Sequence, residues 1–433
     1  MAKQAQDAKN LERKRYLILA AACLAAGLTG ITYMWSVFTT PLMQTHGWNA
    51  SQVSLAYSLY FVMDFIVGIA AGALQRRMGT RPLTIVGGVL LSLGWLFMSH
   101  ADTVALLYLS FSVVGGAGAG FVYNASVSTA TKWFPDKKGF ANGLCIGTTG
   151  LMPIVFAPLG NYLVQTFDLS SALIVVGAIP LVLYVAFGWL VNTPPDGWTP
   201  AGWNPQAEDE VKTQNGEVDE AVEPTAKIPS AALPTAGRDY TSLEMLRTPQ
   251  FWLMFITFVA AANSGAMITS QASSIGAELV GLTAAQGAIM VSLLALGNFA
   301  GRFGLGALSD RIGRYNTLLI SLLVTALDML VVFPMAGDFV GFAVAIMLAG
   351  ACYGGVMTVM PSLCGDLFGM RNFGQNYAIL FGGFAMANLV GPMIAASMFD
   401  MTGSYSGALV VAAVLAACGI VIVLGMRRSA RRG

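Results

Sequence analysis

The sequence predicts an all-α membrane protein in which twelve transmembrane helices form two six-helix halves. Hydrophobic residues make up 56% of the 433 residues, and charged residues make up only 10%. The chain contains twelve apolar stretches of about 20 residues, the length that a helix needs to cross about 30 Å of hydrocarbon. One long polar segment, 192–249, separates the first six stretches from the last six.

In chain order, we expect helices near residues 16–38, 52–75, 82–99, 103–130, 140–166, 170–191, 251–274, 284–308, 316–335, 339–364, 374–398 and 404–426. Lys and Arg residues precede the first helix, follow the last one, and occur in every connection from an even-numbered to an odd-numbered helix. The opposite connections contain none. By the positive-inside rule, both termini are predicted to be cytoplasmic.

The predicted domains are an N-terminal six-helix bundle (1–191), a cytoplasmic linker (192–249) and a C-terminal six-helix bundle (250–433). The linker contains eight prolines and ten acidic residues, too polar a composition to bury a core, so we expect it to be mostly disordered. The five cysteines lack metal-ligand spacing and are expected to be packing residues. The sequence predicts no metal, no cofactor and no catalytic constellation.

A motif repeats across the two halves. The segment 306–314 (GALSDRIGR) follows the eighth helix, and 72–81 (GALQRRMGTR) follows the second. Repeated halves with a site between them are typical of a transporter that rocks about that site. The later copy resembles in full the motif G-x-L-x-D-R-x-G-R of the major facilitator superfamily, whereas the earlier copy has Arg76 in place of the aspartate.

Further segments resemble the oxalate/formate antiporter family, bacterial relatives of the monocarboxylate transporters. They are 118–123 (GAGFVY), 132–139 (KWFPDKKG), 194–198 (PPDGW), 246–252 (LRTPQFW), Gly301-Arg302 and 372–377 (NFGQNY). The resemblance covers nearly the whole chain outside the N-terminus and most of the linker. It implies the major facilitator fold, a bacterial inner membrane as the location, and a small carboxylate as the substrate.

Arg302 is the only one of 23 basic residues inside a long apolar stretch. An arginine at mid-membrane costs about 2.5 to 3.5 kcal/mol even on the lenient insertion scale, so it needs a partner or a function. A guanidinium can bind a carboxylate through two N–H groups, and the resemblance places the substrate-binding arginine of the family at this position. The alternative roles are an ion pair with Asp64 or Asp328, or hydrogen bonds to helix carbonyls that are free to accept them.

The resemblance also implies a second cation in the oxalate carriers, a lysine on helix 11. Phe384 stands at that position here, and 374–398 contains no basic residue. One fixed cation matches one carboxylate, because a second buried carboxylate without a partner costs several kcal/mol. We therefore predict a carrier of a small monocarboxylate (lactate, pyruvate or formate), by proton symport or anion exchange. The alternatives are a dicarboxylate antiporter of the oxalate/formate type, a drug or sugar carrier, and a transporter-like membrane sensor.

Polar and aromatic residues at mid-helix positions are expected to complete the substrate site. They are Tyr33, Tyr123, Asn124, Asn298, Tyr353, Phe381 and Phe384, with Thr32, Trp35 and Thr149 as further candidates. Asp64, deep in the second helix, is the candidate for proton coupling, because a buried carboxyl group without a partner favours its protonated form. A structural, hydrogen-bonded role is its alternative.

Four residues at the cytoplasmic ends of helices 8 to 10 are expected to act as a gate: Asp310, Arg311, Arg314 and Asp366. The expected partners are the lipid bilayer, the carboxylate and, for symport, a proton. We expect a monomer that binds no nucleic acid.

Overall fold

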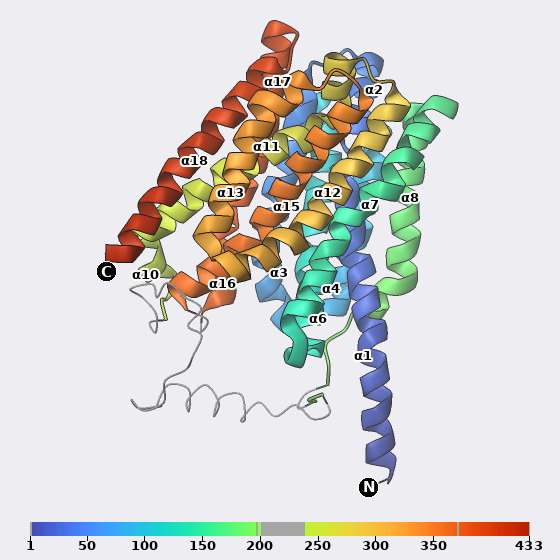
Figure 1. The fold of residues 1–433 in the computed structure, drawn as a ribbon. Helices are drawn as coiled ribbons and strands as arrows, with labels where there is room; N and C mark the ends of the chain where they lie inside the picture. Colours follow the sequence, from blue (N-terminus) through green and yellow to red (C-terminus); the bar gives the residue numbers. More distant parts are fainter. Residues whose placement is uncertain (1, 196–197, 201–238, 370–371, 433) are drawn as a thin grey trace.

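The computed structural model describes residues 2–195, 198–200, 239–369 and 372–432, and these residues are almost entirely helical (Figure 1). Twelve helices among them are long and apolar enough to span a membrane, which confirms the predicted number. The bulk of the predicted linker, 196–197 and 201–238, lies outside the described residues.

Each half contributes six of the spans. Those of the first half are α1 with η1 (Ala2–Thr29, Gly30–Met34), α3 (Ala50–Met78), α4 (Thr80–Met98), α5 through η2 to α6 (Val104–Trp133), α7 (Lys138–Thr166) and α8 with η4 (Leu169–Phe187, Gly188–Leu190). Those of the second half are α11 (Pro249–Val280), α12 (Ala284–Ile312), α13 through η5 to α14 (Arg314–Met335), α15 (Phe339–Phe368), α16 with α17 (Phe373–Leu380, Gly382–Thr402) and α18 (Ser406–Arg432). The short helices α2 (Ser36–His46), η3 (Pro135–Lys137) and α10 (Ser242–Leu246) lie between spans.

The two copies of the repeated motif end their helices in the same way. Gly79 follows α3 with φ 80°, and Gly313 follows α12 with φ 87°. A residue with a Cβ atom is strained at such positive φ values, so glycine is the residue that allows the chain to turn directly into the next helix. The motif therefore shapes the tight connections α3–α4 and α12–α13.

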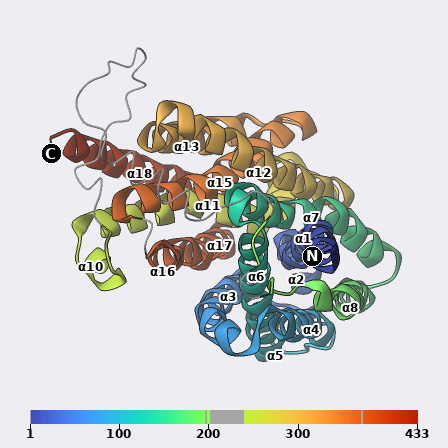
Figure 2. The same ribbon diagram turned by 90° about the horizontal axis from the view of Figure 1, so that it is seen from below.

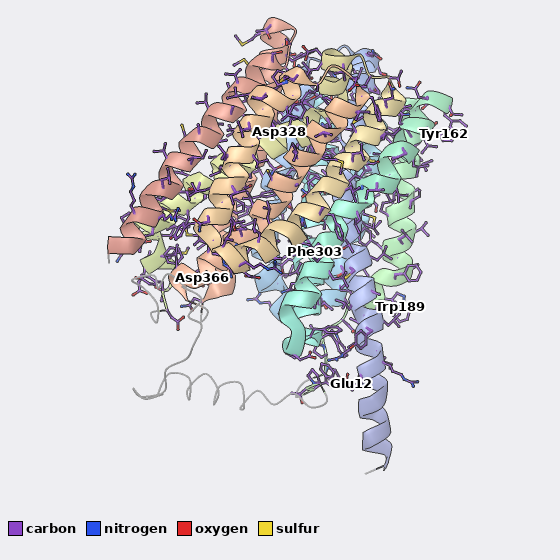
Figure 3. All side chains as sticks on the ribbon, viewed as in Figure 1. Glu12, Tyr162, Trp189, Phe303, Asp328 and Asp366 are labelled. Atoms are coloured by element: carbon purple, nitrogen blue, oxygen red, sulfur yellow. The ribbon has the colours of Figure 1, made fainter. Side chains whose placement is uncertain are left out.

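Aromatic side chains on the outer surface agree with a membrane location. Tyr162 on α7 is 60% exposed and Trp189 in η4 is 52% exposed, and they lie near opposite ends of the helical bundle (Figure 3). Tyr and Trp are enriched where the hydrocarbon meets water, because their rings are amphipathic. Between these levels, large apolar side chains such as Val155 and Val182 face outward.

Both chain termini lie at one end of the bundle, here called the linker end (lower in Figure 1), and the opposite end is called the outer end. Viewed from the linker end, α1 to α8 gather on one side and α11 to α18 on the other (Figure 2). The closest approaches between the halves are α7 against α12 and α3 against α17.

Polar contacts join the two halves toward the outer end. Asp400 of α17 accepts hydrogen bonds from the first two amides of α3, at 2.9 Å from Ala50 N and 2.8 Å from Ser51 N. Asp400 is therefore an N-terminal cap supplied by the other half. Further contacts between the halves join Thr39 to Ser274 (3.1 Å), Ser58 to the carbonyl of Leu389 (3.1 Å), and Ser54 to Gln271. These contacts close the outer end.

Described segments on both sides of the linker are anchored at the linker end. The Trp198 ring lies 4.8 Å from that of Trp133, whose indole N–H donates to the carbonyl of Asn192 (2.6 Å). On the other side, Asn372 and Asn376 each donate to the carbonyl of Tyr240 at 3.0 Å. Several of the segments that carry the family resemblance thus serve to hold the linker against the helices.

Candidate functional site

Arg302 lies in the middle of α12, and glycines fix its position. A Cβ atom on Gly301 would lie 2.0 Å from the carbonyl oxygen of Ala351, and one on Gly354 would lie 2.1 Å from that of Asn298. Glycine at these positions lets α12 and α15 pack backbone to backbone. The rigid helix pair directs the Arg302 side chain toward the first half of the protein.

The guanidinium is buried, with 6% of the residue exposed, and is held on two of its three nitrogens. Nε donates to Oδ1 of Asn298, one turn earlier, at 2.9 Å. Nη1 donates to the carbonyl of Ile146 on α7 at 2.6 Å and approaches Thr149 Oγ1 at 3.5 Å. Nη2 makes no hydrogen bond of good geometry with the described part of the chain and is not among its enclosed, unpartnered atoms, so it faces open space, with the Tyr33 hydroxyl also close to the guanidinium.

That space is a cavity between the two halves, which we call the inner cavity. Its walls come from η1, α3, α6 and α7 of the first half and from α12, α15 and the α16–α17 junction of the second. The lining residues are Thr29, Thr32, Tyr33, Tyr60, Phe61, Asp64, Ala119, Tyr123, Thr149, Arg302, Met357, Phe381 and Phe384. Arg302 and Asp64 are the charged members of this set.

The inner cavity has a volume of about 40 Å³ for the centres of water-sized molecules. One enclosed water needs about 10 to 15 Å³ on the same measure, so the cavity holds roughly three waters or one very small solute. This size favours a small acid and disfavours a sugar or a drug-sized molecule.

Breaks in two helices shape the inner cavity. Helix α1 tightens into the 3-10 segment η1, which places Tyr33 on the wall, and Gly30 lets this segment contact the backbone of Thr149. The span formed by α16 and α17 is interrupted at Phe381, whose amide donates to the carbonyl of Tyr377 at 2.8 Å. Interrupted helices near mid-membrane are a common feature of transporter binding sites.

An aromatic wall faces the guanidinium. The Phe384 ring lies 5.1 Å from that of Phe381, 6.3 Å from that of Phe61, and stacks on Tyr353 at 5.5 Å. Tyr353 in turn donates its hydroxyl to Asn388 at 3.0 Å. The position that carries a lysine in the oxalate carriers is therefore part of an apolar surface.

The predicted residues differ in the space that they line. Tyr33, Tyr123, Phe381, Phe384 and Arg302 line the inner cavity with Thr32, Thr149 and Asp64. Asn298 and Tyr353 line a smaller void behind Tyr33, and Asn298 acts by holding Arg302. Asn124 lies outside the inner cavity and donates to the carbonyl of Gly68 at 3.2 Å. Trp35 is a packing residue whose ring stacks on Phe111 at 4.3 Å.

The sequence analysis did not identify four important contributors. Tyr60 and Phe61 form the wall next to Asp64, and Met357 closes another side. The fourth is the identity of the backbone acceptor, the carbonyl of Ile146, which makes the shortest hydrogen bond of Arg302. Hydrogen bonds from Arg302 to helix carbonyls were among the alternatives in the sequence analysis, but a backbone acceptor has no residue-type signal, so only the structure could show which carbonyl it is.

The alternative ion pair between Arg302 and Asp64 or Asp328 is not formed within the described residues. Asp64 lines the inner cavity but makes no hydrogen bond or ion pair in this part of the chain. Asp328 lies in the π-helical segment η5, buried, and neither of its carboxyl oxygens has a hydrogen-bond partner. Figure 3 shows it toward the outer end of the second half.

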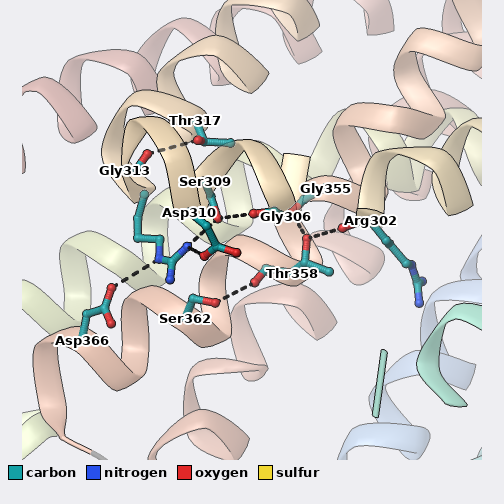
Figure 4. A network of polar contacts seen from close by, with 11 residues as sticks. Arg302, Gly306, Ser309, Asp310, Gly313, Thr317, Gly355, Thr358, Ser362 and Asp366 are labelled. Carbon is teal, nitrogen blue, oxygen red and sulfur yellow. Dashed lines mark hydrogen bonds and ion pairs between the residues drawn. The ribbon is translucent and has the colours of Figure 1, made fainter. Parts of the chain in front are cut away.

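Three of the four expected gate residues form one cluster at the linker end. Arg314 pairs with Asp310, bonds to Ser309 Oγ at 2.7 Å and approaches Asp366 at 3.4 Å. Arg311 is exposed and makes no ion pair with the described residues. Figure 4 shows the cluster joining α12, α13 and α15, with the Arg302 side chain pointing away from it. In this conformation the cluster braces the second half internally.

Comparison with known proteins identifies the family. The sequence profile of the Major Facilitator Superfamily matches residues 17–339 and 253–433. The chain is 30% identical over 380 residues to YhjX of Escherichia coli (strain K12), an uncharacterized MFS-type transporter, covering 88% of this chain and 87% of that protein. It is 28% identical over 386 residues to the oxalate:formate antiporter of Oxalobacter formigenes, covering 88% and 84%. Monocarboxylate transporter 13 of Rattus norvegicus is 24% identical over 411 residues, covering 94% and 88%.

Among solved structures, the fold matches a bacterial homologue of the human lysosomal transporter Spinster, in an inward-facing and unoccupied conformation. The TM-score is 0.69 at 15% sequence identity, covering 97% of this chain and 98% of that one. The chain belongs to the major facilitator superfamily and is a multi-pass membrane transporter with relatives among the oxalate:formate antiporters and monocarboxylate transporters.

Proposed function

We propose that this major facilitator superfamily transporter carries a small monocarboxylate by alternating access and that Arg302 binds the carboxylate. The observation that supports the proposal best is the hydrogen bonding of the Arg302 guanidinium. Two of its nitrogens are held by Asn298 and Ile146, while Nη2 faces the inner cavity without an anionic partner in the described structure. A carboxylate in the inner cavity supplies the acceptor that this nitrogen lacks, in a setting of low polarity where charge-assisted hydrogen bonds are strong.

The charge of the inner cavity favours one carboxylate. Among the described residues, its lining contains a single cation, Arg302, and the position where the oxalate carriers have a lysine is occupied by Phe384. One monocarboxylate neutralises Arg302, whereas a dicarboxylate leaves its second charge against the aromatic wall. The relatives, an oxalate:formate antiporter and a monocarboxylate transporter, support the same class of substrate.

The other predicted residues have supporting roles in this proposal. Tyr33, Tyr123 and Phe381 enclose the acid with Phe384, and Asn298 orients the guanidinium. Asn124 and Tyr353 stabilise adjacent walls. The residues Asp310, Arg311, Arg314 and Asp366 form the predicted gate at the linker end. The proposal covers both proton symport and anion exchange, with Asp64 as the candidate for proton coupling.

We further propose a bacterial inner membrane as the location, with both termini in the cytoplasm. The bacterial relatives and the placement of Lys and Arg on one side of the helices support this orientation. The closed outer end then faces away from the cytoplasm, and the linker end faces it.

The test is uptake of labelled lactate, pyruvate and formate into proteoliposomes that contain the purified protein. We expect uptake by the unmodified protein and none by Arg302→Ala, because that variant lacks the cation of the inner cavity. Arg428→Ala, which removes an exposed arginine at the end of α18, is the matched control and should retain uptake. Normal uptake by Arg302→Ala would refute the proposal, and binding of an acid without uptake would favour the sensor alternative.

A further inference from the structure

A second, larger cavity, here called the vestibule, lies on the linker side of the inner cavity. Its volume for the centres of water-sized molecules is about 460 Å³. It runs along α3 and α6 from the inner cavity to Gln75 and Lys132 at the linker end, with Tyr377 and Ala378 of α16 on the opposite side. The vestibule thus extends from the linker end to the residues that border the cavity of Arg302.

Three residues line both cavities and therefore stand at the boundary between them, here called the passage: Asp64, Tyr123 and Phe381. Tyr123 and Phe381 supply rings, and Asp64 supplies a carboxyl group. Its position is fixed by close helix packing, since a Cβ atom on Gly120 of α6 would lie 2.6 Å from the Asp64 carbonyl oxygen. A carboxyl group thus stands at the entrance to a site whose binding residue is an arginine.

Among the residues that the structure describes, no cation forms an ion pair with Asp64. The elements that pack against α3 are α2, α4, α5, η2, α6 and α17. The titratable and charged groups near Asp64 are Tyr60 of α3, Tyr123 of α6, Tyr33 of η1 and, across the inner cavity, Arg302 of α12. Those farther along the same elements are His46, Arg81, Tyr108, Lys132 and Asp400, toward the helix ends, and Tyr377 lines the vestibule.

We propose that Asp64 is a charge filter in the passage, so that an acid anion moves between the vestibule and Arg302 only while Asp64 carries a proton. This inference deepens the proposed function and depends on it. An ionised Asp64 repels an anion in a passage of low polarity, whereas a protonated Asp64 is neutral and can donate a hydrogen bond to the passing carboxylate. The proton is taken from water in the vestibule, so it comes from the same side as the anion.

The filter links proton and anion without a direct contact between Asp64 and the binding nitrogen. The anion binds to Arg302, the proton stays on Asp64, and the inner cavity as a whole gains no net charge when both are bound. The hydroxyls of Tyr33 and Tyr123 lie within electrostatic reach of both Asp64 and Arg302. Net uptake through such a site is electroneutral and brings in one proton for each monocarboxylate.

The experiment measures labelled lactate and protons together, in proteoliposomes that contain a trapped pH-sensitive dye and are driven by a lactate gradient. We expect one proton per lactate for the unmodified protein. Asp64→Asn should bring this ratio close to zero and make net uptake sensitive to the membrane potential, while exchange of lactate for labelled lactate continues. Asp64→Glu should restore the ratio toward one, which a merely structural role would not require.

Asp328→Asn is the matched control. Asp328 is a similarly deep acid without hydrogen-bond partners, but it lines neither cavity, so its replacement should leave the ratio at one. A ratio of one in Asp64→Asn, or a ratio of zero in the unmodified protein, overturns the filter while leaving carboxylate transport intact. If Asp64→Asn does not fold, the unmodified protein still decides: exchange that does not slow as pH rises on the vestibule side overturns the inference. Absence of any lactate uptake by the unmodified protein would instead refute the proposed function.

Discussion

The charge count of the inner cavity leads to a prediction about selectivity that depends on Phe384. This side chain is 3% exposed and packs among the rings of Phe381, Tyr353 and Phe61, so it offers no partner to a carboxylate. Lactate bound at Arg302 presents a single charge. Oxalate bound there has its second carboxylate against this wall.

The expected discrimination follows from the cost of an unpaired buried charge. Leaving one member of a buried pair without its partner costs about 3 to 5 kcal/mol. At about 1.4 kcal/mol per factor of ten, the lower value already corresponds to about a hundredfold weaker binding of oxalate than of lactate. In proteoliposomes that take up labelled lactate, unlabelled pyruvate should compete at concentrations where oxalate does not.

Phe384→Lys adds a second cation to the inner cavity. It should strengthen competition by oxalate at least tenfold and weaken lactate uptake, since a monocarboxylate then leaves one cation unpaired. Phe384→Met is the matched control, because it keeps an apolar side chain and should leave oxalate a poor competitor. Oxalate competing as well as lactate with the unmodified protein would refute the charge count. An equal gain for oxalate in the Met and Lys variants would show that space, not charge, excluded it.

Three further predictions concern the frame of the site. Arg302→Lys keeps the charge but loses the planar fork, so the apparent lactate affinity in the uptake assay should fall at least tenfold, and an unchanged value would argue against bidentate binding. Gly301→Ala should lower thermal stability in detergent by about 1 to 3 kcal/mol because its Cβ meets the Ala351 carbonyl at 2.0 Å, whereas Gly304→Ala, with open space around it, should not. Asp400→Asn should weaken the cap between the halves by about 1 kcal/mol. A cysteine introduced at the outer end should then react faster with an impermeant thiol reagent. Asp168→Asn removes a cap within one half and should not increase this reaction.

The spans and the importance of Arg302 were predictable from the sequence because both follow from the free-energy cost of placing a charge in hydrocarbon. A charged side chain in hydrocarbon is expensive, so the long apolar stretches are easily recognised and Arg302 is conspicuous within one of them. The family resemblance, not the composition, indicated that Phe384 lies at the substrate site, and in the structure Phe384 lines the inner cavity.

The sequence did not show in the same way which side of each helix faces lipid and which side faces the protein interior. Lipid tails are as apolar as a packed helix interface, so a span shows little periodic contrast between its lipid side and its protein side. Tyr60 and Phe61 were therefore missed although they lie one turn from Asp64, and Asn124, expected at the substrate site, lines the vestibule rather than the inner cavity. The rotation of α3 and α6 that decides these cases comes from close contacts at glycines such as Gly116 and Gly120.

The hydrogen bond from Arg302 to the Ile146 carbonyl gives the cation a role in the movement of the two halves. It joins α12 of the second half to α7 of the first at 2.6 Å, at the depth of the inner cavity. Rocking that separates these helices removes this partner and leaves a charged group short of acceptors in a medium of low polarity. A carboxylate bound at Nη2 compensates both the charge and the lost acceptor, so the loaded protein can change conformation more easily than the empty one. Exchange of one acid for another then needs only the loaded protein to rock, whereas net uptake also needs the empty protein to return. With the proposed filter, the acid passes Asp64 in both modes while that residue carries a proton.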